Sequence, residues 1–300
     1  MCSKLYSYKI LLFYKYVEVK NPGLIVNEHL EWCLQNDIKG RVFIASEGVN
    51  GTISGLNENI EKYKIHLTSY PEFKNLWFKE DDADEHSFKK MHVRLKNEIV
   101  HGDLENVSIE HGGKRLSPEE LLRLYEEGKD FVIVDARNWY ESKIGKFKNA
   151  ITPPMKNFRE WKKVVDEDLI EYKNKTVVTY CTGGIRCEKA SAYMVERGFS
   201  DVYQLDGGIV NFIKKYPDTY WEGGMFVFDE RRAVNPNSKE ELKHIAHCHF
   251  CGKLTSYYIN CHNVDCDKII VSCHECKVTN EYCCSDECRA SVNKRKVFHG

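Results

Sequence analysis

The first hundred residues alternate between the two-residue period of a strand and the longer period of a helix. Aromatic and β-branched residues dominate the opening segment, which is typical of a strand, and a rough helical face follows Pro22-Gly23. Two short strands then flank a turn, a second helix ends at Pro71, and one more strand follows. The expected strands are residues 8–19, 41–45, 52–54 and 91–100, and the expected helices are residues 24–33 and 59–70.

The order β-α-β-β-α-β predicts a ferredoxin-like (acylphosphatase-like) domain, in which an antiparallel sheet carries two helices on one face. Residues 79–90 include a run of acidic residues, and we expect them to form a solvated loop. The last strand alternates apolar and basic positions, so one of its faces is basic. This stripe of His92, Arg94 and Lys96 could contact phosphates, or it could be a charged edge strand that discourages aggregation.

From Leu116 to Trp221 short apolar strands alternate with helices, which predicts a small α/β domain with a largely parallel sheet. A helix is expected to begin after the N-cap Ser117, and a strand over residues 176–180 ends at Cys181. Ligands of such sheets bind outside the carboxyl ends of the strands. The position of Cys181 therefore favours a functional role.

The charge balance and the length of the apolar segments limit the partners that the protein can have. Lys and Arg (44) balance Asp and Glu (45) for a formal charge of −1, so an RNA partner must meet a local patch rather than a global basic field. No apolar run approaches the ~20 residues that span a bilayer, and no signal-peptide pattern is present. We therefore expect a cytoplasmic protein with no membrane partner.

The cysteines are distributed unevenly, because nine of the 13 lie between Cys248 and Cys288. Clustered thiols in a reducing compartment usually bind metal rather than form disulfides. Together with the change from the β-α-β-β-α-β order to strands that alternate with helices, the cysteine distribution predicts that the chain has three parts. They are a ferredoxin-like domain over residues 1–100, an α/β domain over residues 101–225, and a linker with a cysteine-rich module over residues 226–300.

The segment that begins at Cys181 has the strand, tight loop and helix order of an anion-binding loop. Gly183 and Gly184 allow successive backbone N–H groups to point inward, and the start of the following helix adds its positive end. A thiolate is stabilised there and is nucleophilic at neutral pH, although a free cysteine at a strand end can also be a small core residue. Cys187 could be a resolving thiol or could face the core. The candidate residues are Cys181 and Arg186 for catalysis and Thr182, Gly183, Gly184 and Ile185 for the anion-binding or persulfide-binding loop.

The cysteine-rich module contains four closely spaced cysteine pairs, enough for two zinc sites of four thiolates each. Four thiolates close a tetrahedral shell, so the zinc would be structural, and the module would unfold without it. Sequential and interleaved pairing are both possible, Cys283 competes with Cys284, and His247, His249, His262 or His274 could replace a thiolate. The predicted ligands are Cys248, Cys251, Cys261, Cys266, Cys273, Cys276, Cys284 and Cys288.

The Cys181 loop resembles that of the rhodanese family. Asp135-Ala136-Arg137 matches the family's D-x-R at a strand end, Glu141 the acidic residue that follows, and Asp206-Gly207-Gly208 the late glycine pair. The C-x4-R spacing is one residue shorter than the C-x5-R of cysteine phosphatases built on the same fold, and it suits a single sulfur better than a phosphate. The resemblance implies a rhodanese α/β fold and a persulfide on Cys181, cradled by the amides of residues 182–186.

Three blocks together are similar to the three-part tRNA uridine(34) hydroxylases: Gly40 to Gly51, Tyr180 to Ala190, and the cysteine-rich tail. The central C-T-G-G-I-R-C-E-K-A is more particular than a generic rhodanese loop. The resemblance covers almost the whole chain. It implies oxygen-dependent formation of 5-hydroxyuridine at the wobble position, in the anticodon loop of tRNA, with Cys181 essential. O2 would be the co-substrate, and an electron donor that the sequence does not identify would complete the reaction.

The sequence shows no flavin or nicotinamide fingerprint and no two-His-one-carboxylate iron motif. The Cys181 thiolate could then take part in hydroxylation in two ways. The Cys181 thiolate could add to C6 of a flipped uracil, so that C5 reacts directly with oxygen. Alternatively, Cys181 could carry a persulfide that reduces a peroxy intermediate.

Two further functions compete with hydroxylation. One is a persulfide-carrying sulfurtransferase that acts on a thiol or protein acceptor. The other is a zinc-dependent RNA-binding scaffold with an inactive rhodanese fold, against which the intact Cys181 loop argues.

Overall fold

The computed structural model of the chain describes residues 7–217, 219–236 and 241–296. Part of the expected linker, residues 237–240, lies outside these ranges. Among the residues that are described, no helix is long and apolar enough to cross a bilayer.

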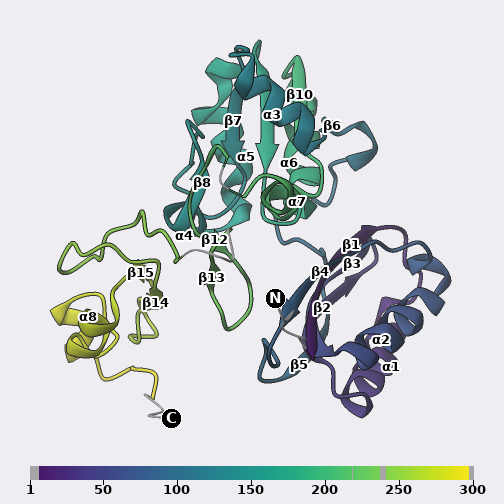
Figure 1. Cartoon of the computed structure of the whole chain (residues 1–300), viewed down its shortest axis with the longest axis horizontal. Helices are drawn as coiled ribbons and strands as arrows, with labels where there is room; N and C mark the ends of the chain where they lie inside the picture. The colour runs from purple at the N-terminus through teal and green to yellow at the C-terminus, as the bar shows by residue number, and fades with distance from the viewer. Residues whose placement is uncertain (1–6, 218, 237–240, 297–300) are drawn as a thin grey trace, which may run out of the picture. The chain divides into compact units, whose positions relative to one another are not determined.

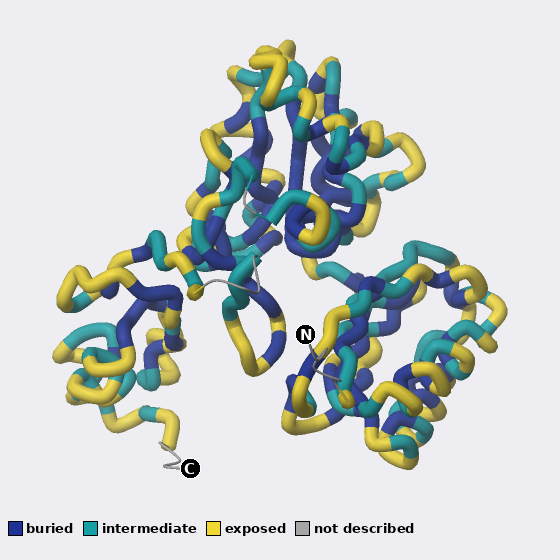
Figure 2. Tube along the Cα trace, viewed as in Figure 1, coloured by how far each residue is buried: buried dark blue, intermediate teal, exposed yellow. Residues whose placement is uncertain are grey.

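The chain forms two compact units. The first consists of residues 1–107 with 228–231, and the second of residues 108–227 with 232–300. In both units the buried positions follow the strands and the helix faces that pack on them (Figure 2). The second unit contains both the α/β domain and the cysteine-rich module.

The first unit is a five-stranded sheet in the order β4-β1-β3-β2-β5, with both helices on one face (Figure 1). Its core lies between that face and the helices, where Leu11 and Phe13 from the sheet meet Ile60, Tyr63 and Leu67 from the second helix. The elements are β1 (Tyr8–Tyr16), α1 (Pro22–Gln35), β2 (Lys39–Ala45), β3 (Gly48–Leu56), α2 (Asn57–Ser69), β4 (Phe78–Ala83) and β5 (Met91–Leu95).

The expectation of a solvated loop over residues 79–90 was wrong in its first half. Strand β4 pairs antiparallel with β1 and supplies the fourth strand of the ferredoxin-like order, while β5 is an additional edge strand parallel to β2. The charges of β4 are compatible with a strand because Phe78 packs on the core and Glu80 accepts hydrogen bonds from Lys9 and Lys64. The Glu80 carboxylate is thus neutralised by ion pairs with neighbouring elements, so this part of the acidic segment does not have to be a loop in water.

The second unit contains a four-stranded parallel sheet in the order β6-β10-β9-β7. Its first helix begins as expected, since the Glu120 N–H donates to the Ser117 hydroxyl and the Ser117 N–H donates to the Glu120 carboxylate. The elements that position the site are β6 (Lys114–Leu116), α3 (Pro118–Glu126), β7 (Val132–Asp135), α4 (Trp139–Ile144), β8 (Gly145–Phe147), β9 (Thr176–Tyr180), α6 (Ile185–Glu196), β10 (Asp201–Leu205) and α7 (Gly208–Lys215).

The remaining elements of the second unit are short. A three-residue helix α5 (Trp161–Lys163) is anchored by the buried Trp161, whose indole N–H donates to the Ala190 carbonyl of α6. After α7 come β11 (Trp221–Gly223), β12 (Met225–Phe226), β13 (Ala233–Val234), β14 (Tyr258–Asn260), β15 (Ile269–Val271), α8 (His274–Thr279) and α9 (Asp286–Ala290).

The cysteine-rich module has little apolar interior of its own. A buried cluster at its centre consists of Cys261, Cys283 and Cys288, with the half-buried Cys284 packed against it. Sulfur atoms therefore take the place that aliphatic side chains occupy in the other two parts. The topology agrees with the predicted fold class: a ferredoxin-like domain, an α/β domain with a parallel sheet, and a cysteine-rich module.

Candidate active site

Cys181 occupies the turn between β9 and α6, as the sequence predicts. Its side chain is fully buried, and the Gly184 N–H donates to its Sγ at 3.1 Å. Gly184 is the N-cap of α6 and has a φ of +100°, a conformation that L side chains rarely adopt. The glycine therefore lets the backbone aim an N–H group at the sulfur.

The carbonyl groups of the loop are held by the start of α7. The Ile209 N–H donates to the Cys181 carbonyl at 3.0 Å, and the Val210 N–H donates to the Thr182 carbonyl at 3.1 Å. Gly208 has a φ of +67°, and a Cβ atom there would lie 2.5 Å from the Cys181 carbonyl oxygen. The Asp206-Gly207-Gly208 motif in the sequence thus marks the segment that packs against the backbone of the Cys181 loop.

Arg186, in the first turn of α6, forms a buried bidentate ion pair with Glu141. Its two terminal nitrogens donate to the two carboxylate oxygens at 2.6 and 2.8 Å. Glu141 is itself fixed, because its carboxylate also accepts the Asn138 N–H in the capping box of α4. Sequence reasoning identified Arg186 and Glu141 separately and missed their pairing, which joins α4 to α6.

A second buried ion pair lies at the end of the neighbouring strand β7. Arg137 donates to both oxygens of Asp135, at 2.8 and 2.6 Å, and also to the Gly145 carbonyl. The same carboxylate accepts hydrogen bonds from the hydroxyl groups of Ser142 and Tyr180, the residue before Cys181. The D-x-R motif is therefore part of a hydrogen-bond network that connects the ends of β7 and β9 through Asp135 and Tyr180.

The electrostatic surroundings of Cys181 favour its thiolate. Burial alone would raise the pKa of Cys181, but a hydrogen bond from the Cys187 side chain, the Arg186 charge and the backbone N–H groups of both residues lower it to about 5. Burial and the Cys181 sulfur raise the pKa of Cys187, which is therefore the protonated partner. An anionic sulfur at neutral pH is the chemically competent form of a nucleophilic cysteine.

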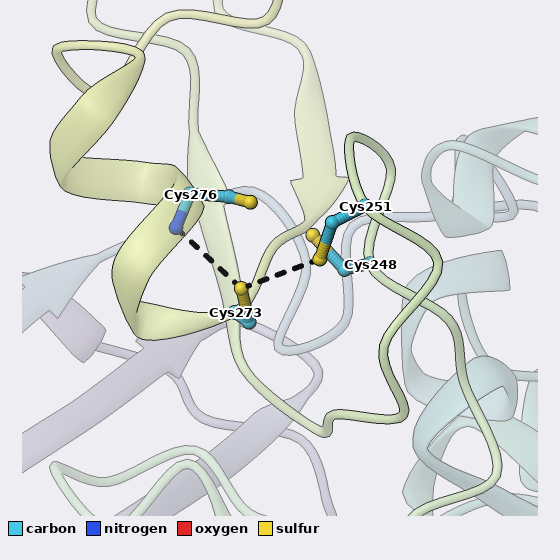
Figure 3. A group of neighbouring side chains, drawn as sticks. All are labelled: Cys248, Cys251, Cys273 and Cys276. Atoms are coloured by element: carbon cyan, nitrogen blue, oxygen red, sulfur yellow. Dashed lines mark hydrogen bonds between the residues drawn. The ribbon is translucent and has the colours of Figure 1, made fainter.

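The eight predicted zinc ligands come together in two sets of four. Figure 3 shows the first set, Cys248, Cys251, Cys273 and Cys276, in which the Sγ atoms of Cys251 and Cys273 lie 3.8 Å apart. The second set is Cys261, Cys266, Cys284 and Cys288. The first and third pairs along the sequence thus share one site and the second and fourth pairs the other, which is the interleaved arrangement.

The sulfur positions fit a tetrahedral metal ion. Four sulfurs bound at about 2.3 Å to zinc lie about 3.8 Å from one another. In the second set, Cys284 Sγ lies 3.7 Å from Cys266 Sγ and 3.6 Å from Cys288 Sγ. Cys283 belongs to neither set, and its thiol donates to the Glu281 carbonyl. The geometry therefore favours Cys284 over Cys283 as the metal ligand.

Comparison with known proteins agrees with this architecture. The model of the "UPF0176 acylphosphatase like domain" matches residues 8–99, that of the "Rhodanese-like domain" residues 117–215, and that of the "Rhodanase C-terminal" residues 222–289. A tRNA uridine(34) hydroxylase of Bacillus mycoides is 41% identical over 97% of this chain and 92% of its own. One of Staphylococcus carnosus is 42% identical over the same shares.

The chain belongs to the tRNA uridine(34) hydroxylase family. The resemblance drawn from the sequence is thereby confirmed along almost its whole length. Membership explains why three parts with different folds occur together, because the matches to these hydroxylases span all of them.

The buried ion pair of this hydroxylase-family site should contribute strongly to stability. Glu141→Gln leaves the Arg186 guanidinium buried without its carboxylate, and breaking a buried pair costs about 3–5 kcal/mol. The expected result is a lower midpoint of urea denaturation for the rhodanese-like domain, followed by circular dichroism. Glu119→Gln is the matched control, because Glu119 pairs with Lys215 at the surface and should leave the midpoint unchanged. Equal shifts in the two variants would contradict the assignment.

Proposed function

We propose that this protein hydroxylates uridine 34 of tRNA and that the Cys181 loop is its active site. The relatives that match it over nearly their full length are named for this reaction. The observation that carries the assignment to the loop is the geometry around the buried Cys181 sulfur. It accepts a hydrogen bond from the Gly184 N–H group and lies beside the Cys187 thiol and Arg186, surroundings that favour its thiolate. A rhodanese-like domain that served only as a scaffold would not need this charge.

In the proposed reaction, the Cys181 sulfur forms a bond to C6 of the uracil, and the electron pair of the C5–C6 double bond moves to C5 and O4 as an enolate. The enolate carbon then bonds to O2, which is the oxidant. Loss of the C5 proton and departure of the thiolate restore the aromatic ring. A two-electron reductant and two protons convert the outer oxygen atom to water, so one O2 gives one hydroxyl group and one water molecule.

The residues of this chain have distinct roles in that scheme. The N–H groups at the start of α6 hold the Cys181 sulfur as an anion before attack and again when it leaves. The Glu141 carboxylate positions Arg186, whose charge favours the anionic sulfur. The thiol of Cys187 remains protonated, because its pKa is raised, and it donates a hydrogen bond to the Cys181 sulfur.

The reaction assignment is tested by nucleoside mass spectrometry of total tRNA from cells that lack the gene. Complementation with the wild-type protein should restore 5-hydroxyuridine derivatives, and complementation with Cys181→Ser should not, because the hydroxyl group is not ionised. Cys33→Ala is the matched control, since Cys33 is buried in the first unit and burial raises its pKa to about 12.

The competing sulfurtransferase function gives a different result. If hydroxyuridine is unchanged in the deletion strain while the purified protein moves sulfur from thiosulfate to cyanide through Cys181, hydroxylation is rejected and sulfur transfer takes its place.

We further propose that each four-cysteine set holds one structural zinc ion. The support is the tetrahedral spacing of the sulfurs and the scarcity of other core residues in the module. Four thiolates leave no open coordination position, so the metal takes no part in the reaction. Zinc would instead fix the loops that carry its ligands.

Two adjacent cysteines offer a matched test of the zinc sites. The wild type should contain two zinc ions per chain by inductively coupled plasma mass spectrometry, Cys283→Ser should keep both, and Cys284→Ser should keep one, because Cys284 belongs to a ligand set and Cys283 does not. Zinc loss in Cys283→Ser but not in Cys284→Ser, or a wild type without zinc, would show that the assignment is wrong.

A further inference from the structure

The helix-free face of the five-stranded sheet carries a group of basic side chains along β2 and β5. Arg41 and Phe43 of β2 lie beside His92 and Arg94 of β5, since Arg41 is in register with His92 and Phe43 with Arg94. Lys96 follows β5, and its ammonium group lies 5.6 Å from the centre of the Phe43 ring. We call these five residues the β2–β5 patch.

Strand alternation puts the patch on the side away from the helices. Val42 and Ile44 of β2, and Met91 and Val93 of β5, enter the core that the sheet shares with α1 and α2. The residues between them point to the opposite face, because successive side chains of a strand alternate.

The stretch of β3 beside the patch adds no charge to this face. The neighbouring positions of β3 on the same face are the uncharged Asn50, Thr52 and Ser54. The β2–β5 patch therefore presents three permanent positive charges and one imidazole beside an uncharged stretch of β3. The next cation on this face of β2, Lys39, pairs with Asp37 and not with the patch.

The cations of the patch have no ion-pair or hydrogen-bond partner among the described residues. Arg41, Arg94 and Lys96 are exposed and His92 is half-buried, and none of the four side chains makes a hydrogen bond or an ion pair within the described ranges. Some basic residues elsewhere in the described ranges are paired instead. Near the C-terminus, Lys294 pairs with Glu281 at 3.2 Å and Arg295 with Asp267 at 2.6 Å.

Protection of an edge strand explains only part of the patch. Strand β5 is at the edge of the sheet, where charged residues discourage pairing with other chains. Strand β2 lies between β3 and β5 and has no free edge, yet it supplies Arg41. A charge on an interior strand, beside charges of the same sign and without a counter-ion, points to an anionic ligand.

We propose that the β2–β5 patch binds the sugar-phosphate backbone of the tRNA substrate. This inference rests on the proposed function, which makes tRNA the polyanion that the protein must hold. Arginine and lysine contacts to phosphate supply most of the affinity for nucleic acid, and a chain with a net charge of −1 has to supply them locally. The ring of Phe43 provides an apolar surface beside the cations, as in sheets that bind single-stranded RNA.

The test compares two variants with the same change in charge. The patch variant is Arg41→Gln, Arg94→Gln and Lys96→Gln together. The control variant is Lys20→Gln, Lys62→Gln and Lys74→Gln together, three exposed lysines of the same unit that lie outside the patch. Binding of an unmodified tRNA transcript to the full-length protein is measured by fluorescence anisotropy over a series of KCl concentrations.

The patch variant should bind tRNA at least about tenfold more weakly at low salt, and the slope of log Kd against log salt should fall by about 2–3, one phosphate contact for each lost cation. The control variant should retain the wild-type slope. Hydroxylation by the patch variant should show a raised KM for tRNA with kcat unchanged, because the chemistry is untouched. Arg94→Lys should restore most of the affinity lost in Arg94→Gln, since a phosphate requires the charge.

Several results would overturn the inference. Equal affinities and slopes for both variants, with active wild-type protein, would exclude the patch as a tRNA surface and leave the hydroxylase function intact. A change of oligomeric state in the patch variant without a change in tRNA binding would assign the patch to a second copy of the chain. Failure of the wild type to hydroxylate tRNA would instead reject the proposed function. Circular dichroism shows whether the triple patch variant folds. If it does not, the comparison of Arg94→Gln with Arg94→Lys tests the inference in its place.

Discussion

A negative charge on a buried sulfur is the constraint on which the arrangement of the α/β domain depends. Removing a thiolate from water is unfavourable unless fixed charges and N–H groups replace the lost hydration. Around Cys181 these come from the start of α6, from Cys187 and from Arg186. Other groups fix this arrangement in turn: Glu141 holds the Arg186 guanidinium group, and the first turn of α7 holds the loop carbonyls. The parallel order of β7, β9 and β10 brings these separate chain segments to one edge of the sheet.

The other two parts of the chain are stabilised by different physical means. The ferredoxin-like domain has an ordinary apolar core between a sheet and two helices. The cysteine-rich module buries mainly sulfur, so its stability in our proposal comes from metal coordination rather than from the hydrophobic effect. This division is consistent with separate tasks, in which one domain reacts, one contacts the polyanionic substrate and one is a metal-stabilised module.

Local patterns in the sequence were sufficient for most of the fold and of the candidate site. The glycines after Cys181, the capping box at Ser117 and the spacing of the cysteine pairs each encode their structure within a few residues. The features that were missed depend on residues far apart in the chain. The acidic run of β4 suggests a solvated loop, but Glu80 in that run pairs with Lys9 and Lys64 from other elements. The contact between Glu141 and Arg186 spans 45 positions. The interleaved pairing of the cysteines likewise follows from the path of the backbone.

The most direct test of the account is the ionisation of Cys181 in the folded protein. The measurement is the ultraviolet thiolate absorbance of the wild type minus that of Cys181→Ser as a function of pH. It is made from the acidic range up to neutral pH, where Cys187 stays protonated in both proteins because burial raises its pKa. Because the surroundings lower the pKa of Cys181 to about 5, the difference should appear as pH rises through about 5 and stay constant from there to neutral pH. A midpoint near the ~8.5 of an ordinary thiol would show that Cys181 is neutral at physiological pH and would contradict the account.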